Sequence, residues 1–133
     1  MENTILNDIE VSPPSVVKRA AHEFASALAA TAEFRAFETA SETFEHDAQA
    51  QEAYHAFQSK QQGISIMKKL NAVTPEEQAE FERLRQAFQS QPSVAAYFEA
   101  QANLIAVCQA AGDVLSNATG LNFGKSASSS GCC

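Results

Sequence analysis

Residues 74–88, TPEEQAEFERLRQAF, carry the strongest local structural signal in this chain of 133 residues. The side-chain oxygen of Thr74 suits an N-cap, and Pro75 suits the first position of a helix. Glu77 stands three residues after Thr74, where its carboxylate reaches back to the Thr74 amide in a capping box. Apolar residues then recur every three or four positions, at Phe81, Leu84 and Phe88. The stretch predicts an amphipathic helix that ends before Pro92, because a residue that precedes proline avoids helical geometry.

The same spacing continues on both sides of this stretch and predicts four further helices. They are one after Pro13-Pro14 that ends near Ala30, one after Thr31, one from Asp47 towards Leu70, and one from Pro92 to a stop at Asn117–Gly120. Thr31 and Asp47 are the expected N-caps of the second and third helices. Gly63 interrupts the third helix at a cost of ~1 kcal/mol relative to alanine, which predicts a bend or a local loosening there.

No segment has the alternating pattern of a strand, and the sequence has no internal repeat. The third and fifth predicted helices carry apolar stripes with a repeat of about 3.5 residues, which is typical of long helices that pack almost antiparallel. The predicted fold class is therefore all-α, a helical bundle with a long antiparallel helical hairpin. We expect a flexible N-terminal lead over residues 1–14, a helical domain over residues 15–120, and a flexible tail rich in Ser, Gly and Cys over residues 121–133.

The composition excludes several classes of protein. Apolar residues make up 45% of the chain, which is enough to bury a core. The formal net charge is −7 and the basic residues are dispersed, so we expect no direct binding of nucleic acid. No apolar run is long enough to span a membrane, and the amino terminus lacks the features of a secretory signal. We therefore expect a cytoplasmic protein with reduced thiols and no contact with a membrane.

The sequence has no motif that indicates an enzyme. A glycine-rich phosphate loop, a His-Glu-x-x-His zinc motif and a Gly-x-Ser-x-Gly nucleophile elbow are all absent. A two-metal site in a helical bundle would need two Glu-x-x-His pairs, and only one exists, at Glu52 and His55. We therefore interpret the glutamates as a solvated helix face and expect no catalytic residue.

Three cysteines remain as candidate ligands. Cys108 falls on the apolar stripe of the last predicted helix, where we expect it to pack as a small buried hydrophobe. Cys132 and Cys133 are the last two residues, and thiolates are soft ligands suited to iron–sulfur, zinc or copper(I) sites. Two ligands do not close a four-ligand site, so a metal would have to be shared with another chain. The alternative is an exposed tail with no role, and the residues alone do not decide between the two.

Three stretches resemble the YlbF/YmcA family of small bacterial regulators. They are residues 32–37 (AEFRAF), 44–57 (FEHDAQAQEAYHAF) and 91–104 (QPSVAAYFEAQANL). Asp47 and Ala50 match an acidic D-x-x-A turn of the family. The P-x-V-x-x-Y/F start of the family's last long helix is matched by Pro92, Val94, Tyr97 and Phe98. The resemblance covers about residues 15 to 120.

The resemblance implies an all-helical fold, often self-associated, and a regulatory role without enzymatic activity in competence, sporulation and biofilm formation. It also implies a complex with a sister paralogue and a third subunit, which influences ribonuclease Y and RNA maturation. That complex carries iron–sulfur clusters bound by cysteine, and Cys132 and Cys133 match the Cys/Gly/Ser-rich tail of some members. Because this tail is short and holds two cysteines, the resemblance implies no cofactor in isolation and a 4Fe-4S cluster only in a complex.

The leading hypothesis is a cytoplasmic adaptor that works by helix-mediated assembly, as a homo-oligomer and with family partners. The apolar stripes of the third and fifth helices exceed what one hairpin covers, so they need a partner face. The residues expected at this interface are Tyr54, Phe57, Ile64, Tyr97, Phe98 and Ile105. The alternatives are a structural homo-oligomer with an inert tail and a metal or thiol carrier that uses Cys132 and Cys133.

Overall fold

The computed structural model describes residues 13–123, and these residues form five α-helices and no strand. The helices are α1 (Pro14–Ala29), α2 (Ala32–His46), α3 (Ala48–Lys69), α4 (Pro75–Gln89) and α5 (Pro92–Thr119). The predicted all-α fold is confirmed, and each predicted helix is present close to its expected ends.

The helices begin and end where short-range chemistry predicts. Thr31 Oγ1 accepts a hydrogen bond from the Phe34 amide at 3.1 Å, and Asp47 Oδ1 accepts one from the Ala50 amide at 3.2 Å. These bonds satisfy amides that have no partner inside the helix. Proline occupies the first turn of α1, α4 and α5. The last helix ends at Gly120, whose φ of 74° is the left-handed conformation that glycine adopts at low cost.

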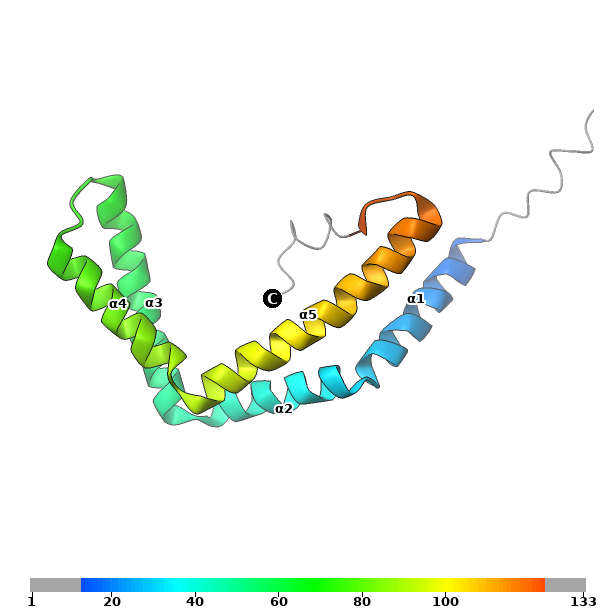
Figure 1. Cartoon of the computed structure of the whole chain (residues 1–133), viewed down its shortest axis with the longest axis horizontal. Coiled ribbons are helices and arrows are strands. Elements are labelled where there is room, and N and C mark those ends of the chain that lie inside the picture. Colours follow the sequence, from blue (N-terminus) through cyan, green and yellow to red (C-terminus); the bar gives the residue numbers. More distant parts are fainter. Residues whose placement is uncertain (1–12, 124–133) are drawn as a thin grey trace, which may run out of the picture.

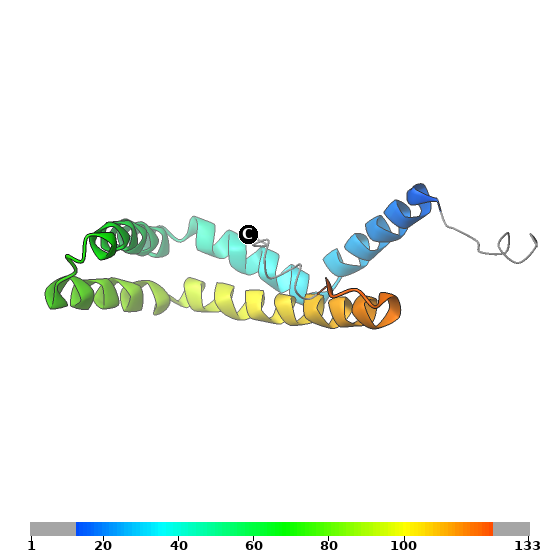
Figure 2. The ribbon, with the colours of Figure 1, turned by 90° about the horizontal axis from the view of Figure 1, so that it is seen from above.

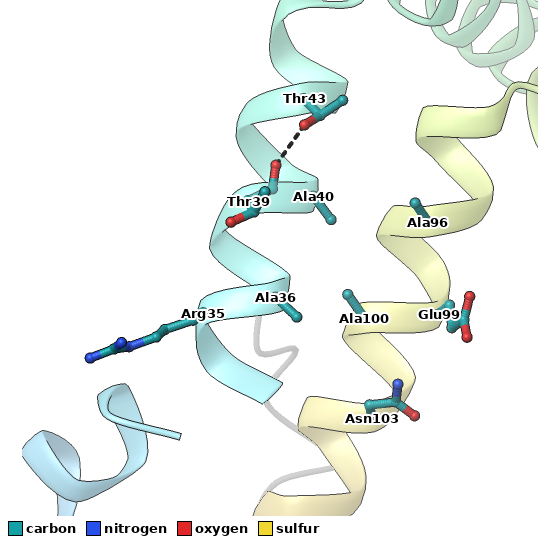
Figure 3. A pocket seen from close by; sticks show the side chains of 9 residues that line it. All are labelled: Arg35, Ala36, Thr39, Ala40, Thr43, Ala96, Glu99, Ala100 and Asn103. Atoms are coloured by element: carbon teal, nitrogen blue, oxygen red, sulfur yellow. Dashed lines mark hydrogen bonds between the residues drawn. The ribbon is translucent and has the colours of Figure 1, made fainter. Parts of the chain in front are cut away.

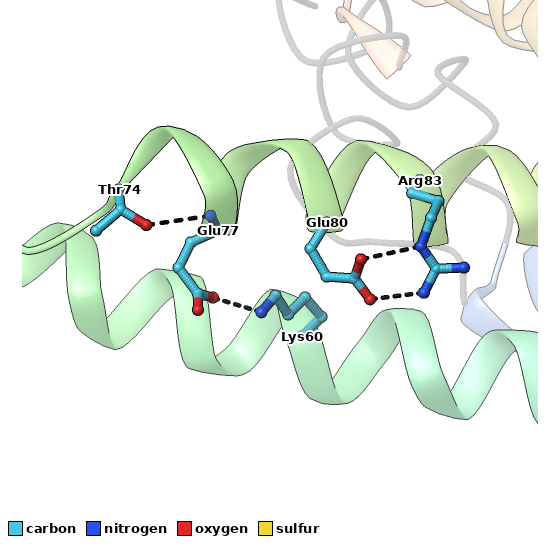
Figure 4. Close-up of polar contacts among 5 residues, drawn as sticks. All are labelled: Lys60, Thr74, Glu77, Glu80 and Arg83. Carbon is cyan, nitrogen blue, oxygen red and sulfur yellow. Dashed lines mark hydrogen bonds and ion pairs between the residues drawn. The ribbon is translucent and has the colours of Figure 1, made fainter.

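The start of α4 differs from the predicted capping box in one bond. Thr74 Oγ1 accepts a hydrogen bond from the Glu77 amide at 3.2 Å, as expected (Figure 4). The Glu77 carboxylate does not return to the Thr74 amide, because it forms an ion pair with Lys60 of α3. This pair joins α4 to α3, whereas Glu80 and Arg83 pair within α4, with 2.6 Å between Arg83 Nη2 and Glu80 Oε1.

Gly63 does not interrupt α3, so the expected interruption is wrong. The helix continues through Ala48–Lys69, and apart from the local helix backbone nothing lies within 4 Å of the position that a Cβ would take at Gly63. The next residue, Ile64, is buried. Packing on this side of α3 outweighs the small propensity penalty of one glycine.

The helices form two arms that meet at an elbow (Figure 1). One arm consists of α3 and α4, and the other consists of α2 and α5; the two helices of each arm lie antiparallel. Asp47 alone separates α2 from α3, and Ser90 and Gln91 separate α4 from α5. Figure 2 shows the α2–α3 connection and the α4–α5 connection at the same place along the length of the molecule. In this view α2 and α3 lie in one layer, and α4 and α5 lie in the other.

The pairing of the long helices differs from the expected one. The structure packs α3 on α4 and α5 on α2, so α3 and α5 lie in different arms and do not form a hairpin together. The short connection over residues 70–74 returns α4 along α3, as short helix connections generally do. The side of α5 that carries Ala96 and Ala100 meets the shorter α2, and the predicted apolar stripe of α5 does not face α3.

The first helix is attached to the rest mainly at its C-terminal end. Thr31 Oγ1 donates a hydrogen bond to the Leu28 carbonyl oxygen at 2.7 Å, but no residue of α1 is buried. Figure 2 shows α1 leaving the α2–α5 arm at an angle. Val16, Val17 and Phe24 are exposed, so no described helix covers the apolar side of α1.

Few of the described side chains are buried. They are Ala40, Ala50, Ile64, Phe88, Val94, Ala100 and the polar Ser93. Ala50, Phe88 and Val94 form one cluster, and Phe44, Ala53, Tyr54 and Phe57 pack against it while half-buried. This cluster lies at the elbow and is the core that holds the two arms together.

The predicted segments 1–14 and 121–133 lie largely outside the described residues, and so do Cys132 and Cys133. Residues 121–123, at the start of the predicted tail, lie against α5, since the Phe123 amide donates a hydrogen bond to Ser116 Oγ at 3.0 Å. Among the helices of residues 13–123, none has the length and apolar character needed to cross a membrane.

Candidate functional site: an aromatic pocket at the elbow

Asp47 links three helices at the elbow. One carboxylate oxygen caps α3 through the Ala50 amide, and the other, Oδ2, accepts a hydrogen bond of 2.6 Å from the Ser93 hydroxyl at the start of α5. Asp47 also follows the last residue of α2, and its amide donates to the Phe44 carbonyl oxygen at 3.2 Å. One residue therefore fixes the end of α2 and the starts of α3 and α5.

The hydrogen bonds to Asp47 lower the pKa of its carboxyl group. The largest cause is the Ser93 hydroxyl and the second is the Ala50 amide, because both donate to the ionised form. The negative charge also lies at the amino-terminal turns of α3 and α5, where the helix dipoles favour an anion. The carboxylate is thus held in its charged form at neutral pH.

Phe88 of α4 is the centre of a ring cluster that spans the elbow. The ring centroids around it are those of Tyr54 at 5.5 Å, Phe57 at 5.8 Å, Phe44 at 6.2 Å and Phe98 at 6.3 Å. Tyr97 joins the cluster through Phe44, at 5.7 Å. Separations of this size are those of favourable aromatic pairs. All four helices that meet at the elbow contribute a ring.

A pocket of about 430 Å³ opens beside this ring cluster, and we call it the aromatic pocket. It is lined by Ser41, Phe44, Glu45, Tyr54, Phe57, Phe88, Val94, Tyr97 and Phe98. Glu45 is the one charged residue of the lining, which contains no paired carboxylates and no nucleophile beside a base. The lining suits a large apolar or aromatic side chain that has a basic group next to it.

The residues predicted at a partner interface occupy three different environments. Tyr54, Phe57, Tyr97 and Phe98 line the aromatic pocket. Ile64 is buried on α3, whereas Ile105 is exposed on α5. The structure thus brings four of the predicted residues together and separates the other two from them.

Cys108 is exposed on α5, so the prediction that it packs as a buried hydrophobe is wrong. Ile105 and Leu115, which belong to the same predicted stripe, are exposed as well. The stripe was expected to face the long third helix, but α3 lies in the other arm. No described helix therefore covers this side of α5.

The described residues offer no metal site. No group of three or more His, Cys, Asp or Glu side chains within residues 13–123 is arranged to hold a metal ion. Glu52 and His55 are both exposed on α3, in agreement with a solvated helix face.

A second hollow, of about 580 Å³, lies between α2 and α5 and shares no lining residue with the aromatic pocket. Figure 3 shows Ala36, Ala40 and Ala100 pointing into the space between the two helices, while Arg35 extends away from it. Small side chains allow the two helix backbones to approach closely. The lining of this hollow combines alanines with polar side chains and contains no aromatic ring. The aromatic pocket is lined by residues of all four helices that meet at the elbow, so it is the stronger candidate for a functional site.

Sequence reasoning missed the role of Ser93. It bonds to Asp47, which lies 46 residues earlier, and no local pattern predicts a contact at that separation. The available signal was its position as a polar residue between Pro92 and Val94, in the first turn of an otherwise apolar helix start. Phe88 was recognised as an apolar stripe residue, but its central place depends on how four helices pair.

The comparisons with known proteins give one match. The family model described as "Control of competence regulator ComK, YlbF/YmcA" matches residues 17–118, which is well over half of the chain and includes the whole elbow. No curated protein and no solved structure matches the chain.

Proposed function

The chain belongs to the YlbF/YmcA family of competence regulators, and on this premise we propose that it regulates by assembling with other proteins and not by catalysis. In this proposal the chain is a cytoplasmic adaptor. Its partners are a second copy, a family paralogue and a complex associated with a ribonuclease. The contact surface is the aromatic pocket together with the neighbouring exposed side of α5.

The observation that supports the proposal is the exposure of large apolar side chains next to the aromatic pocket. Phe98 is 45% exposed and Ile105 is 48% exposed. They are seven residues apart, so they lie on the same side of α5, two turns from each other. Contiguous exposed apolar surface is typical of protein interfaces.

The charge of the chain supports protein partners over nucleic acid. The formal net charge is −7, and α5 contains no lysine or arginine. A surface of this kind repels a phosphate backbone. We therefore expect any effect on RNA to pass through a partner protein.

An iron–sulfur cluster of the 4Fe-4S type belongs to the proposal only as a group shared between chains. Cys132 and Cys133 supply two thiolates, and residues 13–123 contain no grouping of metal-binding side chains that would complete the site. The remaining ligands would come from a partner. The cluster would then stabilise the assembly, because ligation ties one chain to the other.

The proposal is tested by affinity capture. The full chain is co-expressed with the family paralogue of the same genome, as wild type, as Phe98→Asp and as Ile66→Asp. Ile66 is 61% exposed near the end of α3 and lies outside the pocket lining, so it is a matched control for placing a charge on an exposed apolar side chain. We expect wild type and Ile66→Asp to capture the paralogue equally, and Phe98→Asp to lose capture. Equal capture by all three would contradict the proposed contact surface.

The cluster is tested separately, by anaerobic purification of the assembled complex. We expect iron and the visible absorbance of an iron–sulfur cluster in the wild-type complex. The double variant Cys132→Ser with Cys133→Ser should assemble without them. Full iron content in this variant would exclude the ligand role.

One observation favours a second candidate function, a structural homo-oligomer with an inert tail. No helix of the described part of the chain covers the apolar side of α1, which favours self-association without any regulatory partner. This candidate predicts an oligomer that captures no paralogue.

A further inference from the structure

Helix α1 lacks the contacts that a helix of its length needs. It has 16 residues and buries none of them, and an isolated helix of this length is marginal in water. Its apolar residues recur every three or four positions and form one side of the helix, at Val17, Ala21, Phe24 and Leu28. Phe24, the largest of them, is 47% exposed. The helix therefore needs a surface that residues 13–123 of one chain do not give it.

The aromatic pocket lacks an occupant of the kind that α1 presents. Its volume of about 430 Å³ is lined mainly by rings, and Phe98 stands half open to water at its edge. A bulky side chain from a helix would fill this space and remove the rings from water. Phe24 is such a side chain.

The charges of the two surfaces are complementary. Helix α1 contains two basic residues, Lys18 and Arg19, and one acidic residue, Glu23. By contrast, α2 has four glutamates against one arginine, and α5 has two acidic residues and no basic one. Glu45 lines the pocket, and Glu38 lies two turns earlier on the same side of α2. Lys18 lies at the flank of the apolar stripe, whereas Arg19 lies on the opposite side of α1, so Lys18 is the basic residue that suits this acidic edge.

The α1 of the same chain does not reach the pocket. Thr31 and Phe44 lie at opposite ends of α2, roughly 20 Å apart at the helical rise per residue. Figures 1 and 2 show that α1 leaves α2 in the direction away from the elbow. An α1 helix that occupies the pocket therefore comes from another molecule.

We infer that the occupant is a second copy of this chain, with α1 of each copy lying in the aromatic pocket of the other. Phe24 lies among the rings, and Lys18 lies near the acidic side of α2. If the two α2–α5 arms run antiparallel, the start of α2 in one copy lies beside the elbow of the other. Each α1 then crosses the other copy's pocket, and the contact closes as a symmetric dimer. The inference deepens the proposed function and rests on its premise that the pocket is a contact surface.

The first test is the oligomeric state of the full chain, measured by light scattering from low to high micromolar concentration. We expect a dimer, and we expect Phe24→Asp to raise its dissociation constant at least about tenfold. Ile66→Asp, at a side chain that is more exposed than Phe24, should dissociate as wild type does. A wild-type monomer at high micromolar concentration, or a dimer that Phe24→Asp leaves unchanged, overturns the inference.

The second test locates α1 by disulfide trapping. All three cysteines, Cys108, Cys132 and Cys133, are replaced by serine, and the dimer is verified by scattering. Two chains of different mass, one with Phe24→Cys and one with Phe98→Cys, are then mixed and oxidised. We expect a mixed disulfide.

Matched variants keep this test decisive. Arg19→Cys lies on the side of α1 away from the apolar stripe and should trap far less than Phe24→Cys. If Phe24→Cys weakens the dimer, Ala21→Cys with Ser41→Cys forms a second pair between the same two surfaces. A dimer in which neither pair forms a disulfide overturns the inference. So does a single chain that carries both Phe24→Cys and Phe98→Cys and forms the disulfide within itself as a monomer.

The outcomes separate this inference from the proposed function. A monomer that still captures the paralogue through Phe98 overturns the inference and leaves the adaptor role standing. A trapped dimer that captures no paralogue supports the inference and contradicts the adaptor role.

Discussion

At the scale of single residues, the pair of Asp47 and Ser93 explains why the elbow has a defined geometry. Two helices that meet end to end need their free amides satisfied, and Asp47 satisfies one of them in α3. The same carboxylate holds Ser93, which is buried, so the start of α5 cannot slide along α2 without leaving a buried hydroxyl unpaired. A short polar contact thus sets the register of one arm.

The lowered pKa of Asp47 predicts a pH dependence of stability. A carboxyl group whose folded-state pKa is below its unfolded value of about 3.9 stabilises the fold above that value. The stabilisation is lost as the pH falls through the lower folded-state pKa. Because Ser93 is the main cause, Ser93→Ala should lose less stability between neutral pH and acid pH than wild type does, as measured by urea denaturation.

The control for this measurement is Ser90→Ala, which removes a serine hydroxyl that donates to the Ala87 carbonyl oxygen and to no carboxylate. It should keep the wild-type difference between neutral and acid pH. If Ser93→Ala and wild type lose equal stability on acidification, the Ser93 bond does not set the pKa of Asp47.

At the scale of helices, the sequence predicts where each helix begins and ends, but it does not predict which helices pack against each other. Thr31, Asp47 and Thr74 cap their helices through bonds to residues three positions later, so the relevant partners are visible in the local sequence. The choice of α2 over α3 as the neighbour of α5 depends on contacts between distant segments, and periodicity does not encode it. The wrong prediction for Cys108 and the missing second bond of the capping box at Glu77 have the same cause. In both cases a distant helix decides what the side chain meets.

Gly63 and Gly120 predict opposite effects of the same substitution. Gly63 lies inside α3 with open space around the missing Cβ, so Gly63→Ala should raise the free energy of unfolding by about 0.5–1 kcal/mol. Gly120 has a φ of 74°, so Gly120→Ala should lower it by about 1 kcal/mol. Thermal melts of the two variants beside wild type check both signs. A shift of Tm in the same direction for both would show that the backbone conformation at these positions is different.

At the scale of the whole molecule, two arms share one small core. Phe88 lies in α4 of one arm, and its ring meets Phe44 of α2 and Phe98 of α5 in the other arm. Phe57 stacks on it from within its own arm, with an angle of 9° between the ring planes. The arms therefore depend on the same side chain for their relative position.

This arrangement predicts that Phe88→Ala destabilises the molecule as a unit. Removing a buried phenylalanine costs about 3–5 kcal/mol, and here it also separates the arms. We expect a large loss in the urea midpoint and a less cooperative transition, detected by comparing circular dichroism with tyrosine fluorescence. Ile66→Ala, at an exposed position, should leave both properties near wild type. A cooperative transition of unchanged midpoint in Phe88→Ala would contradict a shared core.

The scarcity of buried side chains also has a calorimetric consequence. Unfolding of a typical domain raises the heat capacity by about 12–15 cal/mol/K per residue, because apolar surface becomes hydrated. Within residues 13–123 the fully buried apolar side chains are three alanines, one isoleucine, one phenylalanine and one valine, so a single chain exposes less apolar surface on unfolding than a globular domain of the same length does. Its unfolding enthalpy should then change less with temperature, and its stability curve should be shallower. A partner that covers α1 and α5 would add the missing apolar burial and steepen that curve, so cold and heat would affect the assembly and the isolated chain differently.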